Sequence, residues 1–435
     1  LGIPAGDEWN LSAPFSDKSL IRTALMSLLA QKMGQSAHSR LCHLFIDDDY
    51  RGIYLLLERK TVRPGRIDIA PMTPQDESGD ALTGGYLLRL DHQRERPGFD
   101  SPFTPSRDNK YPVHYQFENP GEAITAAQQE YIRAWVTRFE KNADTPTNPD
   151  YIHDLDLSSF VDYFILNEAA KNVHGYRDLT LFYKDRDSRG GKLAIEPIIE
   201  FHHALGNAAF FAGDLVNGWQ IDYLLKNSDA RSDTLVAPFW WGRLLKDPRF
   251  TAPLYKRWVS LRQGALAENQ VFHVADSLYR ELKTEQVLNF ERWMIFDKTV
   301  WPNNSIAATY DEEFDTMIIW LMDRLDWLDE AMQAFRTDVA HSNEPQIVST
   351  PVLAQNFPNP FNPMTTIRFK LPRASHVELH IFSVTGQEIA VLLNEEKSAG
   401  EHQVSWNAVG QPSGVYFYQL RIGDTEQLKR MVLLR

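Results

Sequence analysis

The stretch FVDYFILNEAAKNVHGYRDLTLFYKD, residues 160–185, contains the change from helix to strand that sets the fold class of the first part of the chain. Apolar residues recur at helical spacing over 157–171, and a short alternating run follows over 179–184. A second alternating run covers 193–199, and the polar turn Asp185-Arg186-Asp187 separates the two runs, which predicts a small β-hairpin. Helix followed by paired strands indicates an α+β fold.

Other strands are predicted before this stretch. Alternating runs at 41–46 and 52–58 are separated by the acidic turn Asp47-Asp48-Asp49, which predicts a hairpin, and 84–90 predicts another strand. Residues 92–112 are polar and proline-rich, which predicts an exposed loop.

Helices are predicted on both sides of these strands. Ser16 is a candidate N-cap for a helix that carries apolar residues from 20 to 33 and ends at Gly34. Longer amphipathic patterns predict helices over 124–141 and 314–335. The first unit is therefore a mixture in which strands come early and helices come late.

The composition changes after residue 336. Residues 337–352 are polar with two prolines, as linkers are, and the remainder consists of short alternating runs separated by Pro and Gly. This spacing predicts an all-β sandwich, so we divide the chain into a domain at 1–336, a linker at 337–352 and a domain at 353–435. The predicted strands are 365–371, 376–383, 388–393, 400–406, 414–422 and 428–434.

Charge and composition exclude several classes of protein. The net charge is −13, and the last 85 residues contribute 8 basic and 7 acidic side chains, so the acidity belongs to the first domain. Nucleic-acid binding needs clustered positive charge and is not expected. No apolar run approaches the roughly 18 residues of a membrane span. The single cysteine, Cys42, excludes an internal disulfide.

The C-terminal residues resemble a known family. The opening QNFPNPFNPMTTIRFKLP (355–372), the strand GEHQVSW (400–406) and SGVYFYQL (413–420) closely resemble the type A C-terminal sorting domain of the type IX secretion system. We expect Trp406, Tyr416 and Tyr418 to fill the core of an Ig-like sandwich. The resemblance implies that the type IX secretion machinery is a partner, and that the protein is secreted by a bacterium or displayed on its surface.

The first domain resembles the spore-coat protein H (CotH) kinase family. The matching blocks are WNLSAPFSDKSLIRTALMSLLAQKMG, YRGIYLLLERK, RPGRIDI, GGYLLRLD, residues 160–185 and IEFHHALGN at 199–207, in the family's order. The resemblance implies a two-lobed atypical protein-kinase fold that transfers the γ-phosphoryl group of ATP to hydroxyls of an acceptor protein, with Mg²⁺ or Mn²⁺. The family's Gly/Ser-rich phosphate segment normally precedes Trp9, so we expect the N-terminal part of this domain to be missing.

Phosphoryl transfer needs carboxylates to orient the hydroxyl and hold the metal. By resemblance, His174 stands where the family has an acid, Leu179 stands at a polar position, and Ile199-Glu200-Phe201-His202 replaces Trp-Asp-aromatic-Asp. We expect His174 and Asn172 at the catalytic position, Glu200 and His202 at the metal, and Glu58 and Lys60 toward the nucleotide. His202 suits Zn²⁺ or Mn²⁺ better than Mg²⁺.

Three functions remain open at this point. One is an active atypical kinase that uses Glu200 and His174, and another is a pseudokinase that serves as a surface-binding or scaffold protein. The third is a metal-dependent hydrolase built on Glu200, His174 and the pair His202-His203. The simpler interpretations are that Glu58 is a solvated strand-end charge, that Lys60 is a surface cation, and that Asn172 and Asn207 are turn residues.

Overall fold

The computed structural model describes most of the chain. The described residues are 8–35, 38–64, 66–90, 96–104, 111–148, 150–178, 180–196, 200–227, 234–303, 306–336, 351–359, 361–383, 386–412, 414–423 and 425–433. Residues 337–350 of the predicted linker, and Leu179 and Ile199 of the family motifs, lie outside these ranges. The helices are α1 (Arg22–Lys32), α2 (Gly79–Leu82), α3 (Ala126–Asp144), α4 (Leu157–Ala170), α5 (Gln220–Lys226), α7 (Trp240–Leu244), α8 (Pro248–Arg262), α9 (Glu268–Leu282), α10 (Gln286–Arg292) and α11 (Tyr310–Ala331), with 3-10 turns at Gly121–Ala123, Asp150–Asp154, Asp187–Arg189 and Met332–Phe335.

The first sheet is built on the predicted hairpin. Its antiparallel order is β1-β3-β2, with β1 at Trp9–Ser12, β2 at Ser39–Ile46 and β3 at Asp49–Glu58. Asp47 and Asp48 both have positive φ, as the two central residues of a tight hairpin turn require. The sequence prediction for this hairpin is therefore confirmed.

The second sheet contains the strands that follow β3 in the first domain. Its antiparallel order is β5-β6-β4-β7-β8, and β7 and β8 form the hairpin predicted after residue 178. The strands are β4 (Tyr86–Leu90), β5 (Gly98–Asp100), β6 (His114–Asn119), β7 (Leu181–Lys184) and β8 (Leu193–Glu196). The prediction of an exposed loop at 92–112 is wrong at β5, where Phe99 is buried against Tyr115; residues 91–95 and 105–110 of that stretch lie outside the described residues.

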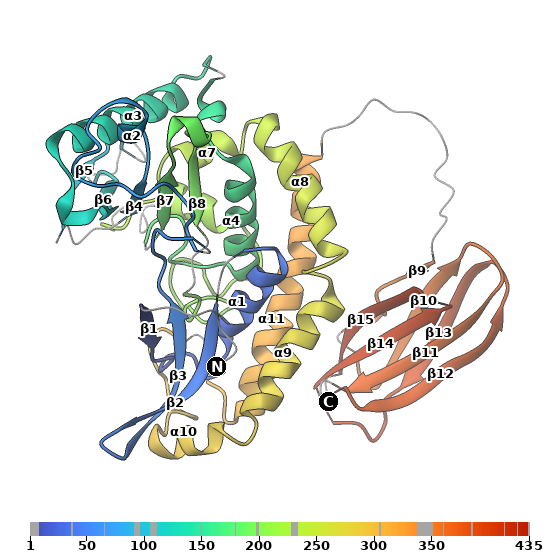
Figure 1. Ribbon diagram of the computed structural model, residues 1–435. Helices are drawn as coiled ribbons and strands as arrows, with labels where there is room; N and C mark the ends of the chain where they lie inside the picture. The colour runs from blue at the N-terminus through green and yellow to red at the C-terminus, as the bar shows by residue number, and fades with distance from the viewer. Residues whose placement is uncertain are drawn as a thin grey trace.

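Most helices of the first domain lie within residues 126–335, which we call the helical half, and helix α4 is packed inside it. Helix α4 begins where the Asp156 side chain accepts a hydrogen bond from Ser158 N, and its apolar residues cover all sides. A helix that is apolar all round is a buried one. It packs against α8, α11 and β8, as Figure 1 shows, so its C-terminal end is fixed in the interior.

The start of α1 differs from the prediction. The helix begins at Arg22, after the N-cap residue Ile21, and Arg22 N donates to Asp17 Oδ2 at 3.0 Å. Ser16 is therefore not the N-cap. A turn at Asp17–Leu20, in which Leu20 has a φ of 62°, lies between Ser16 and the helix.

The C-terminal residues form an all-β sandwich, as predicted. One sheet has the order β12-β11-β14-β15 and the other β13-β10-β9. Trp406, Tyr416 and Tyr418 are buried in its core, as expected from the sequence. The strands are β9 (Val352–Leu353), β10 (Met364–Leu371), β11 (Ser375–Ser383), β12 (Glu388–Lys397), β13 (Gly400–Asn407), β14 (Gly414–Ile422) and β15 (Thr425–Leu433).

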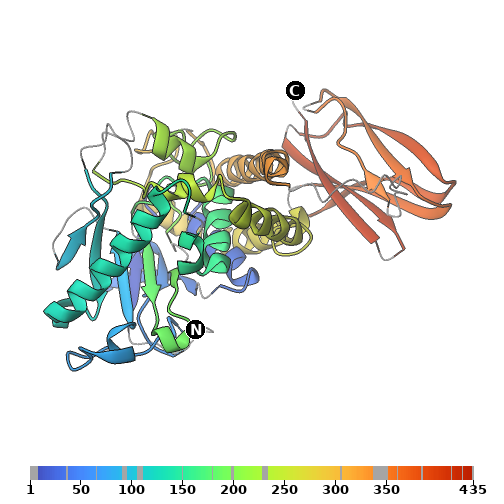
Figure 2. The ribbon, with the colours of Figure 1, turned by 90° about the horizontal axis from the view of Figure 1, so that it is seen from above.

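The outer face of the four-stranded sheet packs on helices α9 and α11 (Figure 2). The Phe272 and Phe417 rings lie 4.4 Å apart, and both side chains are buried. Arg430 of β15 forms an ion pair with Asp323 and donates to Ile319 O at 2.8 Å. The sandwich thus shares an apolar and charged contact with the helical half.

Candidate functional site

The site begins where α4 ends. Lys171 takes the left-handed conformation, with a φ of 47°, and this turns the chain out of the helix into Asn172–His174. Gly175 has no space for a side chain, because an added Cβ would lie 2.6 Å from Asn167 Oδ1. The tight turn places His174 on one wall of the site.

Asn172 joins the two segments that form the site. It is fully buried; its Oδ1 accepts from His174 N at 3.1 Å, and its Nδ2 donates to Glu200 O at 3.3 Å and Asn167 Oδ1 at 3.2 Å. The amide is occupied by these bonds. Asn172 therefore holds the turn at His174 against the segment that begins at Glu200.

Three imidazoles meet at this junction. One ring nitrogen from each of His174, His202 and His203 lies within 4.8 Å of the other two. His174 Nε2 is 2.9 Å from His203 Nδ1, and His203 Nε2 is 3.2 Å from Ser16 Oγ. On the far side of its ring, His174 Nδ1 lies 3.4 Å from Asp178 Oδ2.

Two asparagines hold the segment that carries the histidine pair. Asn207 Nδ2 donates to His202 O at 2.8 Å and to Ser16 O at 2.9 Å. Asn303 Nδ2 donates to Asn207 Oδ1 and Ser16 O, each at 2.6 Å. Asn207 is therefore more than a turn residue, since it connects His202 to Ser16.

Aromatic side chains form the rim of the site. Phe210 and Trp301 stack with their rings 5.6 Å apart and nearly parallel, and the Trp301 ring lies 5.8 Å from that of His203. Trp301 is 74% exposed, which is unusual for so large an apolar ring. The histidines therefore lie beside an exposed aromatic surface.

Burial disfavours the charged forms of Glu200, His202 and His203. Desolvation raises the pKa of Glu200, against a smaller opposing effect of His174. Desolvation lowers the pKa of His202, and it lowers that of His203 to about 3 with help from the neighbouring His202 and His174. His202 and His203 are therefore neutral imidazoles at neutral pH.

Comparison with known families identifies both parts of the chain. A family model described as CotH kinase protein matches residues 2–328. The chain belongs to the CotH kinase family. A second family model, described as secretion system C-terminal sorting domain, matches residues 355–434. No match to a curated protein was found.

The sorting domain gives this CotH-family protein its location. A type IX secretion sorting domain directs its carrier to the cell surface or the medium through the secretion machinery, as predicted from the sequence. None of the helices in the described ranges is both long and apolar enough to cross a bilayer.

CotH kinases imply ATP and a divalent metal, and the residues present fit Mg²⁺ poorly. Mg²⁺ requires near-octahedral oxygen ligands. The clustered donors here are the nitrogens of His174, His202 and His203, a group that does not include Glu200, the acid expected at the metal. The donor set is that of a metal which accepts imidazole.

The two residues expected toward the nucleotide lie in ion pairs. Glu58 is 1% exposed at the end of β3, with Oε1 2.7 Å from Arg66 Nε and Oε2 2.8 Å from His38 Nδ1. Lys60 is also buried, and its Nζ lies 3.2 Å from Glu196 Oε2. The interpretation of Glu58 as a solvated charge and of Lys60 as a surface cation is wrong, because each is buried against an opposite charge.

The partners of the histidine rings are not evident from the sequence. Ser16 is a candidate helix cap by its pattern, and no motif singles out Asp178. Ser16 is 187 residues from His203 in the sequence, and only the packing of the turn before α1 brings them together. His203 had been considered only within the hydrolase alternative.

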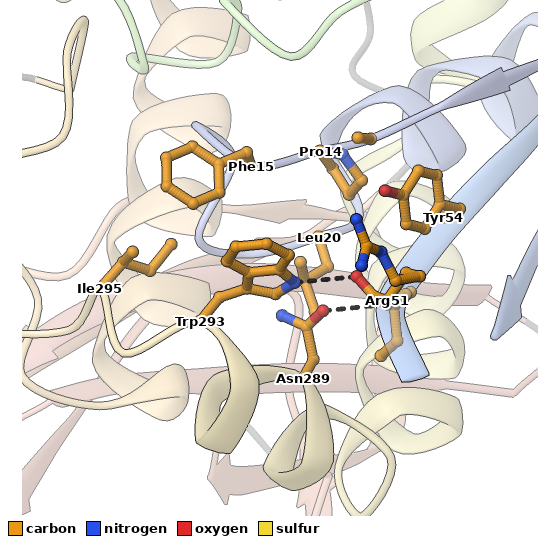
Figure 3. Close-up of a pocket in the computed structure, with 10 residues that line it drawn as sticks. Pro14, Phe15, Leu20, Arg51, Tyr54, Asn289, Trp293 and Ile295 are labelled. Atoms are coloured by element: carbon orange, nitrogen blue, oxygen red, sulfur yellow. Dashed lines mark hydrogen bonds between the residues drawn. The ribbon is translucent and has the colours of Figure 1, made fainter. Parts of the chain in front are cut away.

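A separate apolar hollow of about 200 Å³ lies beside the first sheet (Figure 3). Phe15 and Trp293 line it with ring centroids 5.9 Å apart. Trp293 Nε1 donates to Arg51 O, and Asn289 Oδ1 accepts from Ile53 N, each at 2.9 Å. These bonds attach α10 to β3. The residues lining this hollow include no pair of acid and base, so we do not assign it to catalysis.

Proposed function

We propose that this protein is a secreted pseudokinase of the CotH family, which binds a ligand or partner at the cell surface through its remodelled family site. The observation that carries the proposal is the cluster of His174, His202 and His203, which brings nitrogens together in the segments that, by the family resemblance, would carry the oxygen ligands for Mg²⁺. Imidazole side chains do not neutralise phosphate charge as a metal held by carboxylates does.

The basic side chains Arg89, Lys60 and Arg66 support the same proposal. Phosphate binding needs cations that are available to the ligand. Arg89 Nε lies 2.9 Å from Glu118 Oε1, and Lys60 and Arg66 face Glu196 and Glu58. Each of these basic groups is therefore already neutralised by a carboxylate of the protein.

The rim of the site supports a binding role. The stacked pair of Phe210 and Trp301 presents a flat apolar surface beside His203, and most of the Trp301 ring is open to solvent. Exposed aromatic rings of this kind are enriched where proteins bind partners. We therefore expect Trp301→Ala to weaken binding of a surface partner and to leave the fold intact.

Calorimetry with ATP and Mg²⁺ or Mn²⁺, followed by transfer of radiolabel from γ-labelled ATP to a casein-type acceptor, tests the proposal. We expect no metal-dependent labelling. The competing function is an active kinase, and the observation in its favour is that Glu200 keeps a carboxylate at a family metal position. Labelling that is abolished by Glu200→Ala and retained in a control variant, Glu130→Ala on the exposed face of α3, would overturn the pseudokinase proposal.

A further inference from the structure

The spacing of the three imidazoles is close to that of a metal site. Two nitrogens bound to one tetrahedral Zn²⁺ at about 2.0–2.1 Å lie about 3.3 Å apart. His174 Nε2 and His203 Nδ1 are 2.9 Å apart, and a nitrogen of His202 completes a group within 4.8 Å. Movements of a few tenths of an ångström in the side chains bring the first two nitrogens to ligand spacing.

The outer partners of the rings decide which nitrogens carry hydrogen. Ser16 Oγ lies 3.2 Å from His203 Nε2, and a hydrogen there leaves the lone pair of this neutral imidazole on Nδ1. Asp178 Oδ2 faces His174 Nδ1 at 3.4 Å, and a hydrogen there leaves the lone pair on Nε2. Metal-bound histidines characteristically donate their second N–H to such oxygens.

With both outer positions filled, two lone pairs face each other at 2.9 Å. The contact is satisfied in one of two ways: the Ser16 hydroxyl donates to His203 Nε2 and His203 Nδ1–H donates to His174 Nε2, or a cation lies near both nitrogens. In both cases the buried His174 Nδ1 faces Asp178 Oδ2 at 3.4 Å without a regular hydrogen bond. A bound cation satisfies both facing lone pairs at once.

We propose that His174, His202 and His203 bind a divalent transition metal of the Zn²⁺ type, with Ser16 and Asp178 orienting the rings. The inference rests on the proposed function in treating the same location as a binding site, but it names the ligand and is measured without nucleotide. Three protein ligands leave one coordination position open, and the partial exposure of all three histidines gives an ion access to it.

The test uses the full chain without a polyhistidine tag, stripped with a chelator and titrated with Zn²⁺ in a calorimeter. We expect one equivalent to bind, and Mg²⁺ in large excess to leave the Zn²⁺ affinity unchanged. Co²⁺ in place of Zn²⁺ should give the visible absorption bands of a site with nitrogen ligands. His174→Ala and His203→Ala should each lower the affinity at least 100-fold, whereas His273→Ala, at an exposed position on α9, should leave it unchanged.

Ser16→Ala provides a milder variant if the histidine variants fail to fold, and we expect it to lower the affinity about 10-fold through the loss of ring orientation. The absence of a saturable Zn²⁺ site in the folded wild-type protein, or equal binding in His174→Ala and wild type, overturns the inference. These outcomes are distinct from those for the proposed function: labelling from ATP would overturn the pseudokinase alone, and failure to bind Zn²⁺ would overturn the metal site alone.

Discussion

Replacing Arg324 by Met should destabilise the helical half strongly. The Arg324 and Glu168 side chains are fully buried, and Nη2 lies 2.9 Å from Oε2. The guanidinium also donates to three backbone oxygens, those of Glu168, Val216 and Gly218. This pair therefore joins α11 to the last turn of α4 and to the segment before α5.

The expected loss of folding stability follows from the buried Glu168 carboxylate, which the substitution leaves without its arginine. Glu168 would keep its hydrogen bonds from Gln220 N, Ile221 N and Tyr176 Oη, but it would lose its only ion-pair partner among the described residues. Burial raises the pKa of Glu168 and lowers that of Arg324 to about 10, so desolvation of both charges is costly. Removing one partner of a buried pair costs about 3–5 kcal/mol, because the other charge remains.

Urea unfolding followed by tryptophan fluorescence measures this loss, and Trp240 and Trp241 are buried reporters in the same half. Lys226→Met is the matched control: it removes an exposed ion pair with Asp222 and should change the free energy of unfolding by less than about 0.5 kcal/mol. The double variant of Arg324→Met with Glu168→Gln should recover about 1–3 kcal/mol of the summed losses. A loss below about 1 kcal/mol for Arg324→Met would refute the reasoning.

Three further predictions concern other parts of the chain. Burial raises the pKa of Glu140 to about 7, so the contribution of this carboxyl to stability is present below pH 4.5 and is lost as the pH rises through 7. Glu140→Gln should therefore raise the free energy of unfolding by as much as about 3 kcal/mol at pH 8.5 and leave it unchanged near pH 4. Melting curves at both pH values measure this difference. Gly175→Ala should cost about 1–3 kcal/mol by calorimetry, because its Cβ would clash with Asn167; an unchanged melting temperature would contradict the close approach. Deleting residues 355–435 should stop secretion, and cell fractionation should find the protein in the periplasm; unchanged surface display would contradict the sorting role.

The sandwich was predictable because its strands alternate and turns separate them. Each predicted strand agrees with an observed one to within a few residues, since these strands place alternate apolar residues in or against the core between the sheets. Helices α5, α7, α8, α9 and α10, by contrast, were not assigned from sequence. Three of these five are short, at 5 to 7 residues, and the longer α8 contains Pro253, so the patterns of these four are weak or interrupted. Helix α9 has a regular amphipathic pattern over 15 residues and was predictable from it.

The site was predictable in part. The family resemblance selected His174, Glu200 and His202, but it could not show that His203 hydrogen-bonds His174 or that Ser16 contacts His203. These contacts depend on how the turn before α1 packs against the segment at 200–207. The burial of Glu58 could not be predicted either, because its partner Arg66 lies beyond the end of the strand.

The contact between the sandwich and the helices affects how secretion experiments should be designed. Phe272 on α9 is shielded by Phe417, so a chain cut before residue 355 exposes this ring to water together with its apolar neighbours. Such a protein can self-associate through this apolar surface and fail to be secreted for a reason unrelated to the loss of its sorting signal. Substituting exposed residues on the three-stranded sheet, such as Arg368, alters a solvent-facing surface of the sandwich and keeps the helical half covered. Loss of secretion in such a variant would separate recognition from solubility.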